Sequence, residues 1–284
     1  MFTDLPFELP DFELINAQAK DRFEKAKKDV NLPGRFIGVS LGKWLKHVEA
    51  SGVPFVPAKD IASISREVWL RAEECLNEDV TVWEQFEKDC MNEPDTGMIR
   101  IDPCSGLDLK SAMANGSGVP TSAERKTVSP SDPRAFDIVY SYPADHFPIW
   151  SRPWVEAQYH DGYPVEFRVF VKNGEVCAVA NYYPQRALPD DAAMNKRAND
   201  CLDMAKTIVA YLDEQGQCPW MPDYEGKFEA GKVSATLDFL ITPEGTPVFL
   251  EAGPPFGAGA HPCAFIDREV KGVALALAPG VKLR

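Results

Sequence analysis

The second half of the chain alternates hydrophobic and polar residues with the period of two that is typical of β-strands. Two such runs, Val165–Lys172 and Glu175–Tyr182, flank Asn173-Gly174, which is the dipeptide preferred by type I′ hairpin turns. The hairpin would leave Glu166 and Arg168 on the polar side of its first strand. Its register predicts three apolar cross-strand pairs: Val171 with Val176, Val169 with Ala178 and Phe167 with Ala180.

A second pair of strand-like runs, Lys232–Thr242 and Thr246–Ala252, is joined by a Pro-Glu-Gly turn. If these runs pair around a four-residue loop, Asp238 lies opposite Glu251. Directly opposed residues have Cβ atoms about 4.5–5.5 Å apart, and like charges there destabilise the sheet. A hard divalent cation such as Mg²⁺ would relieve this repulsion. The alternatives are two unrelated acids on a solvent-facing hairpin, or a register that separates them.

Helical periodicity dominates the first hundred residues and returns after the first hairpin. Helices are predicted at Leu41–Ala50, Ile64–Leu76, Thr81–Cys90, Leu107–Ala114, Asp190–Glu214 and Asp267–Ala278. Further strands are predicted at Phe36–Ser40, Met98–Asp102, Ala135–Tyr142 and Trp150–Gln158. Residues 115–132 are rich in Gly, Ser, Thr and Pro, which is typical of a functional flap or of a disordered connector. The pattern therefore predicts an α+β protein with a mainly helical region, 1–96, followed by a β-rich domain, 97–284.

Composition narrows the class of protein. Acidic side chains outnumber basic ones by 43 to 30, and the net charge of −13 disfavours non-specific binding of nucleic acid, although a local basic pocket remains possible. The seven cysteines are scattered and form no C-x-x-C pair, which indicates reduced thiols. Because the chain shows neither a basic and apolar leader nor a membrane-length apolar run, we expect a cytoplasmic protein without a membrane partner.

Common catalytic motifs are missing from the sequence. It contains no G-x-x-x-x-G-K-[ST] phosphate loop and no G-x-S-x-G, and its four histidines are dispersed. The Glu166-x-Arg168 pair is suited to a nucleotide, because Glu can accept from ribose hydroxyls and Arg can contact phosphate. Taken alone, the pair is more typical of a solvated cross-strand salt bridge. The aromatic and basic segment Trp150–Glu156 could flank an adenine or pack at a core edge.

The order of these pieces resembles the ATP-grasp superfamily from about Gly97 to the end of the chain. The motifs that carry the resemblance are Arg152-Pro153-Trp154-Val155-Glu156, Val165–Val171 with its Glu-x-Arg, and Leu250–Gly257 with its Glu followed by prolines. They are most similar to the branch that holds the eukaryotic cell-division-cycle chaperone assembling translation initiation factor two, with phage and bacterial relatives. The resemblance implies an ATP-grasp fold, in which the nucleotide lies between two β-rich lobes.

The resemblance also implies roles for individual residues. Asp238 and Glu251 would hold Mg²⁺ against the phosphates of ATP, and Arg168 would join them in catalysis. The implied nucleotide contacts are Glu166 at the ribose, Arg168, Arg100 and Lys110 at the phosphates, and the backbone of Trp154, Val155 and Glu156 at the adenine, with Arg152 nearby.

Two positions depart from the ligases of this superfamily. Gly253 replaces a frequent Asn that would bind a second metal, and Thr236 replaces a frequent basic residue. The resemblance implies an ATP-dependent carboxylate–amine or carboxylate–thiol ligase that acts through an acylphosphate. The alternative is an ATP-binding assembly factor that grips a protein partner with little or no ligation, and a fold without nucleotide is the third possibility. The carboxylate or amine substrate, which could be a protein or peptide, cannot be read from the sequence.

Overall fold

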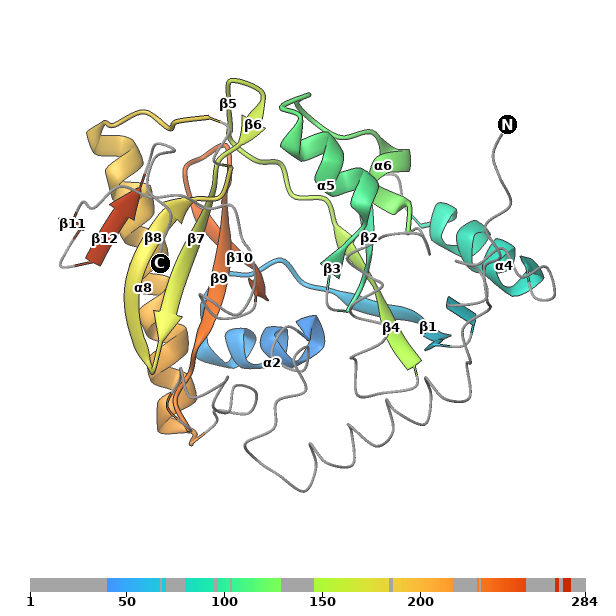
Figure 1. Ribbon diagram of the computed structural model, residues 1–284, viewed down its shortest axis with the longest axis horizontal. Coiled ribbons are helices and arrows are strands. Elements are labelled where there is room, and N and C mark those ends of the chain that lie inside the picture. Colours follow the sequence, from blue (N-terminus) through green and yellow to red (C-terminus); the bar gives the residue numbers. More distant parts are fainter. Residues whose placement is uncertain are drawn as a thin grey trace, which may run out of the picture.

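The computed structural model describes residues 40–66, 68–69, 80–93, 97–102, 104–128, 146–183, 186–216, 229, 231–253, 269–270 and 273–276. They form an α+β fold, as predicted. Two mainly antiparallel sheets, one of six strands and one of four, lie beside each other with helices at their flanks (Figure 1).

The six-stranded sheet carries both predicted hairpins. Its order is β10 (Pro247–Gly253), β9 (Ala235–Ile241), β7 (Glu166–Lys172), β8 (Glu175–Asn181), β12 (Val273–Ala276) and β11 (Glu269–Val270). Helices α8 (Ala192–Glu214) and α2 (Leu41–Ser51) pack on one face of this sheet and enclose the larger hydrophobic core with it. The opposite face carries Glu166, Arg168 and Asp238 together with apolar side chains such as Leu240.

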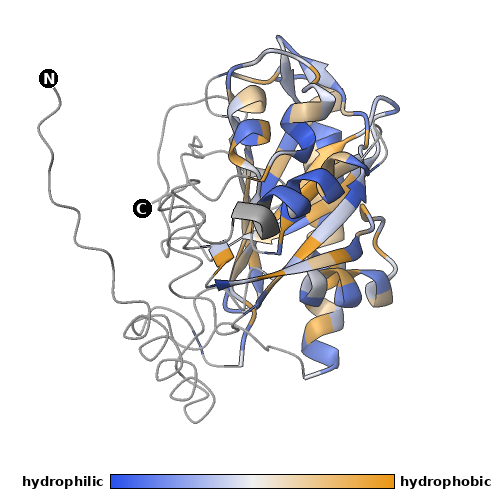
Figure 2. Ribbon diagram, turned by 90° about the vertical axis from the view of Figure 1, so that its right-hand side faces the viewer, coloured by the Kyte–Doolittle hydropathy of each residue, from blue (hydrophilic) through white to orange (hydrophobic). Residues whose placement is uncertain are grey.

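Helix α8 forms where the sequence predicts it. The side chain of Asp191 accepts a hydrogen bond from the Met194 N–H at 2.8 Å, which caps the first turn. Its buried residues recur every three or four positions: Met194, Ala198, Cys201, Leu202, Ala205, Ile208, Val209 and Leu212. Figure 2 shows hydrophilic and hydrophobic residues mixed along the helices.

The four-stranded sheet has the order β1 (Lys59–Ser65), β4 (His146–Pro153), β2 (Gly97–Ile101) and β3 (Cys104–Ser105). A second hydrophobic core, with Ile99, Phe147 and Ile149 among its members, packs on one face of it. Helices α4 (Val80–Met91), α5 (Leu107–Ala114) and α6 (Ser122–Lys126) flank this sheet, and a two-stranded ribbon of β5 (Tyr159–His160) and β6 (Tyr163–Pro164) lies above the gap between the sheets (Figure 1).

The six-stranded sheet with α2 and α8 is here called the larger unit, and the four-stranded sheet with α4, α5 and α6 the smaller unit. The extended segment 53–58, here called the strap, connects α2 of the larger unit to β1 of the smaller unit (Figure 1). Its Val56 N–H donates to the Phe249 carbonyl at 3.0 Å, and the Phe249 N–H donates to the Pro54 carbonyl at 2.9 Å. Phe55 thereby forms a parallel bridge with Phe249 of β10. The strap ties the early part of the chain to a strand close to its other end.

Several predicted elements differ in the structure. Ile64 and Ser65 close strand β1 instead of opening a helix, and a short helix, α6, interrupts the predicted loop 115–132. Helix α6 forms because Thr121 and Glu124 build a reciprocal capping box. The helix predicted at Asp267–Ala278 is wrong where the structure describes it, because β11 and β12 lie there and β12 pairs with β8. The strands predicted at Phe36–Ser40 and Ala135–Tyr142 fall outside the described residues, apart from Ser40, and β4 ends at Pro153 rather than continuing to Gln158.

Both hairpins form, but each contains a β-bulge that the sequence did not reveal. Asn173 and Gly174 have φ values of 53° and 80°, as a type I′ turn requires. The predicted pair Val171 with Val176 is correct. A bulge at Cys177 then shifts the register, so the observed pairs are Phe170 with Ala178, Val169 with Val179 and Phe167 with Asn181. In the second hairpin Ile241 pairs with Pro247, and the Thr242 N–H donates to the Thr246 carbonyl at 2.9 Å. Three residues therefore close the turn, and the predicted four-residue loop is wrong by one position.

Other expectations concern the chain as a whole. Cys90, Cys104, Cys177 and Cys201 are free thiols, and the other three cysteines lie outside the described residues. No described helix is both long and apolar enough to cross a membrane. The domain boundary at residue 96 stays a prediction, although β1 from the first region pairs with β4 of the second.

Candidate functional site

A cleft of about 590 Å³, counting its open mouth, lies between the two sheets. One part of its lining is apolar and the other carries charged groups from both sheets. The apolar residues include Met98, Leu109, Met113, Val155, Ala157, Leu240 and Leu250, and the charged residues are Arg100, Lys110, Arg152, Glu166 and Glu251. The lining therefore offers apolar surface to a ring system and charged groups to an anion.

Strands β7 and β9 place the acidic and basic residues of the larger sheet on the face opposite α8. Phe167 and Val169 of β7 point into the helix-covered core, so the intervening Glu166 and Arg168 point toward the cleft. Arg168 pairs with Asp238 across the two strands. Although the residues from Glu166 to Val171 are all buried, the strand has two chemically different faces.

A bulge at Leu250 brings Glu251 to the same face. Phe249 pairs with Phe239 and packs in the core, and in a regular strand Glu251 would lie on the side of Phe249. The bulge inserts Leu250, so Glu251 instead pairs with Asp238. The predicted opposition of the two acids is thus confirmed, but it arises from a shorter turn followed by a bulge.

Asp238 is held by a bidentate ion pair. The Arg168 Nε and Nη2 donate to the Asp238 Oδ1 and Oδ2 at 2.7 and 2.6 Å, and the Asp238 side chain is fully buried. Burial raises the pKa of Asp238, and Arg168 opposes that rise. This planar pairing satisfies both carboxylate oxygens of Asp238.

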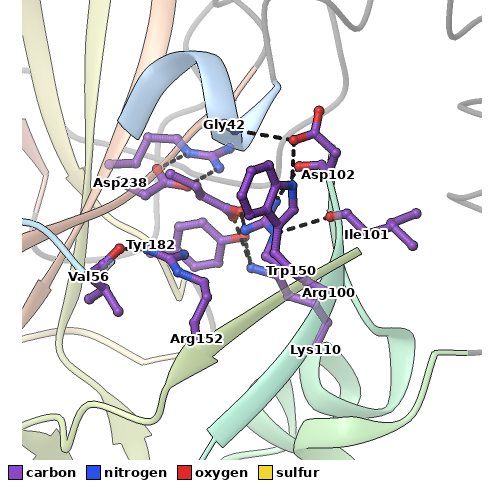
Figure 3. Close-up of polar contacts among 12 residues, drawn as sticks. Gly42, Val56, Arg100, Ile101, Asp102, Lys110, Trp150, Arg152, Tyr182 and Asp238 are labelled. Carbon is purple, nitrogen blue, oxygen red and sulfur yellow. Dashed lines mark hydrogen bonds and ion pairs between the residues drawn. The ribbon is translucent and has the colours of Figure 1, made fainter. Parts of the chain in front are cut away.

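Glu251 is held by two cations, Arg100 from strand β2 and Lys110 from helix α5. The Arg100 Nη1 donates to the Glu251 Oε2, and the Lys110 Nζ lies 3.5 Å from the Oε1. Arg100 also donates to the carbonyls of Ile101 and Asp102, both at 3.2 Å, which fixes its guanidinium (Figure 3). Burial alone would raise the pKa of Glu251, but Arg100 and Lys110 hold it well below its usual range.

Glu166 is the buried acid that retains an unused oxygen. Its Oε2 accepts from the Tyr183 hydroxyl at 3.4 Å, whereas its Oε1 has no hydrogen-bond partner among the described residues. Burial raises the pKa of Glu166 to about 8, against the lowering effect of Lys110. A buried acceptor without a partner, on the wall of a cleft, fits the hydroxyl groups of a ligand.

The predicted adenine hinge follows β4 and borders the cleft. Trp154 and Val155 line it, while the Glu156 side chain is exposed. Within the described part of the chain, the backbone groups of residues 154–156 make no hydrogen bond to other backbone groups. The indole N–H of Trp154 is buried and also has no described partner. Backbone and indole groups are therefore available to a ligand.

Arg152 has a different position from the other predicted cations. It lines the cleft, yet its Nη2 donates to the Val56 carbonyl and its Nε donates to the Pro57 carbonyl at 3.4 Å. Burial, and then the charge of Arg100, lower the pKa of Arg152. In this structure Arg152 anchors the strap, and its role at a nucleotide stays a prediction.

The structure thus brings together Arg100, Lys110, Glu166, Arg168, Asp238 and Glu251 in one contiguous polar network. Sequence reasoning missed Tyr182, which contacts Lys110, and Asp102, which contacts Trp150. Nothing in the local pattern distinguishes Asp102, because it acts on a residue distant in the sequence. For Tyr182, the adjacent aromatic pair Tyr182-Tyr183, directly after the Glu-x-Arg hairpin, is a local signal.

The donor set suits a hard divalent cation. Asp238 and Glu251 are opposed carboxylates, and their present cationic partners show that the site needs positive charge to offset them. Within the described part of the chain, no three His, Cys, Asp or Glu side chains are arranged to hold a metal ion. A Cβ at Gly253 would collide with the Thr236 Oγ1 and lie 3.5 Å from the Arg168 Nη2. The fit is to a cation completed by ligands from outside the protein.

Comparison by sequence and by structure gives different results. No protein-family model matches the sequence, and curated proteins give no match. Among solved structures, Cdc123 from Schizosaccharomyces pombe is 16% identical, with a TM-score of 0.46 over 78% of this chain and 84% of that one.

Two enzymes are also similar in structure. Macrocyclase MdnC from Microcystis aeruginosa, solved with its precursor peptide MdnA, is 12% identical, with a TM-score of 0.40 over 91% of this chain and 67% of that one. N5-carboxyaminoimidazole synthase from Aspergillus clavatus, solved with ADP and its ribonucleotide, is 10% identical, with a TM-score of 0.38 over 81% of this chain and 49% of that one. These distant similarities carry no conclusion about activity. The three TM-scores are all below 0.5, so the resemblance to ATP-grasp proteins and to the Cdc123 branch stays a prediction.

Proposed function

We propose that this protein binds ATP with Mg²⁺ in the cleft between its two sheets. The observation that carries the proposal is the convergence of Arg100, Lys110 and Arg168 on the opposed acids Asp238 and Glu251. Arg100, Lys110 and Glu251 also line the cleft. Phosphate groups match the three cations, and Mg²⁺ matches the two carboxylates. An adenine ring matches the apolar wall beside residues 154–157.

Charge balance explains how one site could bind both phosphates and Mg²⁺. In the ligand-free arrangement each carboxylate neutralises a guanidinium or ammonium group. On binding, Arg100, Lys110 and Arg168 would pair with phosphates, and Asp238 and Glu251 would pair with Mg²⁺. The exchange leaves no buried charge without a partner, which would otherwise cost several kcal/mol. Glu166, with its unused oxygen, would accept from a ribose hydroxyl.

The finer proposal is an ATP-dependent ligase that joins a carboxylate to an amine or a thiol through an acylphosphate. When bound, Mg²⁺ would supply positive charge to the transferring phosphoryl group. Arg100, Lys110 and Arg168 would hold the phosphates in place, and the apolar wall would exclude water from them. The cytoplasmic location and the carboxylate and amine substrates remain predictions.

A second candidate function is an ATP-binding assembly factor with a protein partner. Thr236 and Gly253 favour it, because the buried Thr236 provides no cation beside the transferring phosphate and its hydroxyl fills the space of any side chain at position 253. Such a protein would bind ATP and Mg²⁺ without releasing ADP in response to small substrates.

The test of nucleotide binding is the affinity for ATP with and without Mg²⁺, measured by calorimetry. We expect Asp238→Asn and Glu251→Gln each to reduce the Mg²⁺-dependent gain in affinity roughly tenfold or more, since each removes a charged ligand. Glu244→Gln removes an exposed acid from the turn of the same hairpin and is the matched control. If all three variants keep the Mg²⁺-dependent gain of the parent, the proposed site is wrong.

The two candidate functions are separated by turnover. A ligase releases ADP and phosphate only when a carboxylate and an amine or thiol are both present. An assembly factor gives no such release across a broad panel of amino acids and peptides, and it retains one stoichiometric protein partner in pull-down experiments.

A further inference from the structure

Tyr182 lies where the two halves of the charged network meet. It directly follows β8, and its backbone N–H donates to the Glu166 carbonyl at 2.9 Å, which fixes the residue beside β7. Figure 3 shows its ring among the charged side chains, close to Lys110. No motif in the sequence assigns a role to this residue.

The ring of Tyr182 contacts a cation from each unit of the protein. The Lys110 Nζ, from α5, donates to the Tyr182 hydroxyl at 3.1 Å and lies 4.9 Å from the ring centroid. The guanidinium carbon of Arg168, from β7, lies 4.8 Å from the same centroid. The aromatic ring therefore supports two cations that would otherwise repel each other across the site.

Tyr182 differs from the other partners of these cations because it carries no charge at neutral pH. The acids Asp238 and Glu251 compete with any incoming anion for Arg168 and Lys110. A neutral ring and hydroxyl attract a cation without cancelling its charge. Tyr182 can therefore keep its contacts with both cations when the acids change partners.

We propose that Tyr182 is a positioning residue that holds Lys110 and Arg168 at the spacing needed to receive the phosphates of a nucleotide. This proposal rests on the proposed function. The hydroxyl directs Lys110, which lies 3.5 Å from Glu251 and would relax fully onto that carboxylate without it. The ring sets the position of the Arg168 guanidinium, which pairs with Asp238 through its Nε and Nη2.

The two contributions are separable by substitution. Tyr182→Phe keeps the ring and removes the hydrogen bond to Lys110, whereas Tyr182→Leu removes both. Tyr159→Phe is the matched control, because Tyr159 is also a partly exposed tyrosine whose hydroxyl oxygen is buried, but that hydroxyl has no partner among the described residues. Binding is measured by competition of ATP with Mg²⁺, and of adenosine, against a fluorescent ATP analogue.

We expect Tyr182→Phe to weaken ATP binding about fivefold and Tyr182→Leu roughly thirtyfold, with adenosine binding unchanged within a factor of two, since adenosine lacks phosphates. In a Lys110→Met background, Tyr182→Phe should have less than about a twofold effect, because its partner is gone. Tyr159→Phe should bind both compounds as the parent does.

Equal losses for ATP and adenosine would show that Tyr182 merely supports the fold and would overturn the inference, as would unchanged ATP binding in Tyr182→Leu. The same effect of Tyr182→Phe with and without Lys110 would also overturn it. If the parent itself fails to bind ATP, the proposed function falls and this inference falls with it. The parent thus distinguishes the two failures.

Discussion

At the scale of single residues, Asp238 and Glu251 oppose each other on β9 and β10 yet shift their pKa values in opposite directions. Burial is the largest influence on both. For Asp238 it outweighs the single guanidinium of Arg168, and the pKa rises. For Glu251, Arg100 and Lys110 together outweigh burial, and the pKa falls. The two cations beside Glu251 therefore favour its ionised form more strongly than Arg168 favours that of Asp238.

Glu166 predicts a pH dependence of stability. Burial raises its pKa to about 8 from an ordinary value of 4.5. The folded state keeps this proton at pH values where the unfolded chain has lost it. The contribution of protonated Glu166 to the unfolding free energy is therefore fully present below pH 4.5 and is lost as the pH rises through 8. We expect the unfolding free energy of the parent, relative to that of Glu166→Gln, to fall by on the order of a few kcal/mol between pH 5 and pH 8.5. Urea unfolding across this range measures the difference.

The control for this titration is Leu240→Met, because Leu240 lies directly across from Glu166 on β9. It alters packing beside the carboxyl group without changing charge, so its effect on stability should be the same at every pH. Parallel pH profiles for the parent and Glu166→Gln would contradict the prediction.

At the scale of elements, the sequence predicted the two hairpins but neither the bulge in each nor the pairing between distant strands. The Asn173-Gly174 turn and the capped helix α8 carry local signals, and both were predicted correctly. The residues of β9 are buried on both faces, so no alternation marks its register. The bulges at Cys177 and Leu250 are settled by packing against helices and neighbouring strands, which local sequence does not encode.

The same limit explains the candidate site. Glu166, Arg168, Asp238 and Glu251 could be predicted because each lies in a hairpin whose turn is marked in the local sequence, whereas Arg100 and Lys110 came from the resemblance alone. Tyr182 and Asp102 could not be predicted, because their partners lie 72 and 48 or more positions away along the chain. The C-terminal segment was wrongly predicted as a helix because its local pattern does not show that β12 pairs with β8, which is distant in the sequence.

The close contact between β9 and β10 predicts a steric requirement for glycine at position 253. Any Cβ there would collide with the Thr236 hydroxyl oxygen. We expect Gly253→Ala to lower the unfolding free energy by about 1–3 kcal/mol, as overpacking in a core does. Thermal and urea unfolding measure the loss.

The companion variant Gly253→Ala/Thr236→Ala removes the colliding oxygen. It should therefore be more stable than the sum of the two single substitutions predicts. Strict additivity would show that the two residues do not compete for space.

At the scale of the whole molecule, the two sheets are joined by polar contacts outside the cleft. The Asp102 Oδ1, at the end of β2, accepts from the Gly42 N–H at 3.2 Å and from the Trp150 Nε1 at 2.8 Å (Figure 3). The backbone carbonyl of Asp102 accepts from the Leu41 N–H at 3.4 Å. Asp102 thus caps helix α2 of the larger unit from a strand of the smaller one.

We expect Asp102→Ala to lower the unfolding free energy by about 2–3 kcal/mol, because two donors near the contact lose their shared acceptor. Urea unfolding measures this loss. Asp108→Ala, at an exposed position in the first turn of α5, should change the unfolding free energy by less than about 0.5 kcal/mol. Equal effects of the two substitutions would show that the Asp102 contact contributes nothing specific.

The strap has a consequence for folding during synthesis on the ribosome. Its hydrogen bonds with Phe249 join a segment synthesised early to a strand synthesised late. Helix α2 and the strap leave the ribosome well before β10 exists, so they cannot reach their final positions while most of the chain is still being made. Packing of the larger core is therefore a late event. A nascent chain interrupted before β10 would expose the apolar side of α2, and a chaperone could bind that exposed side.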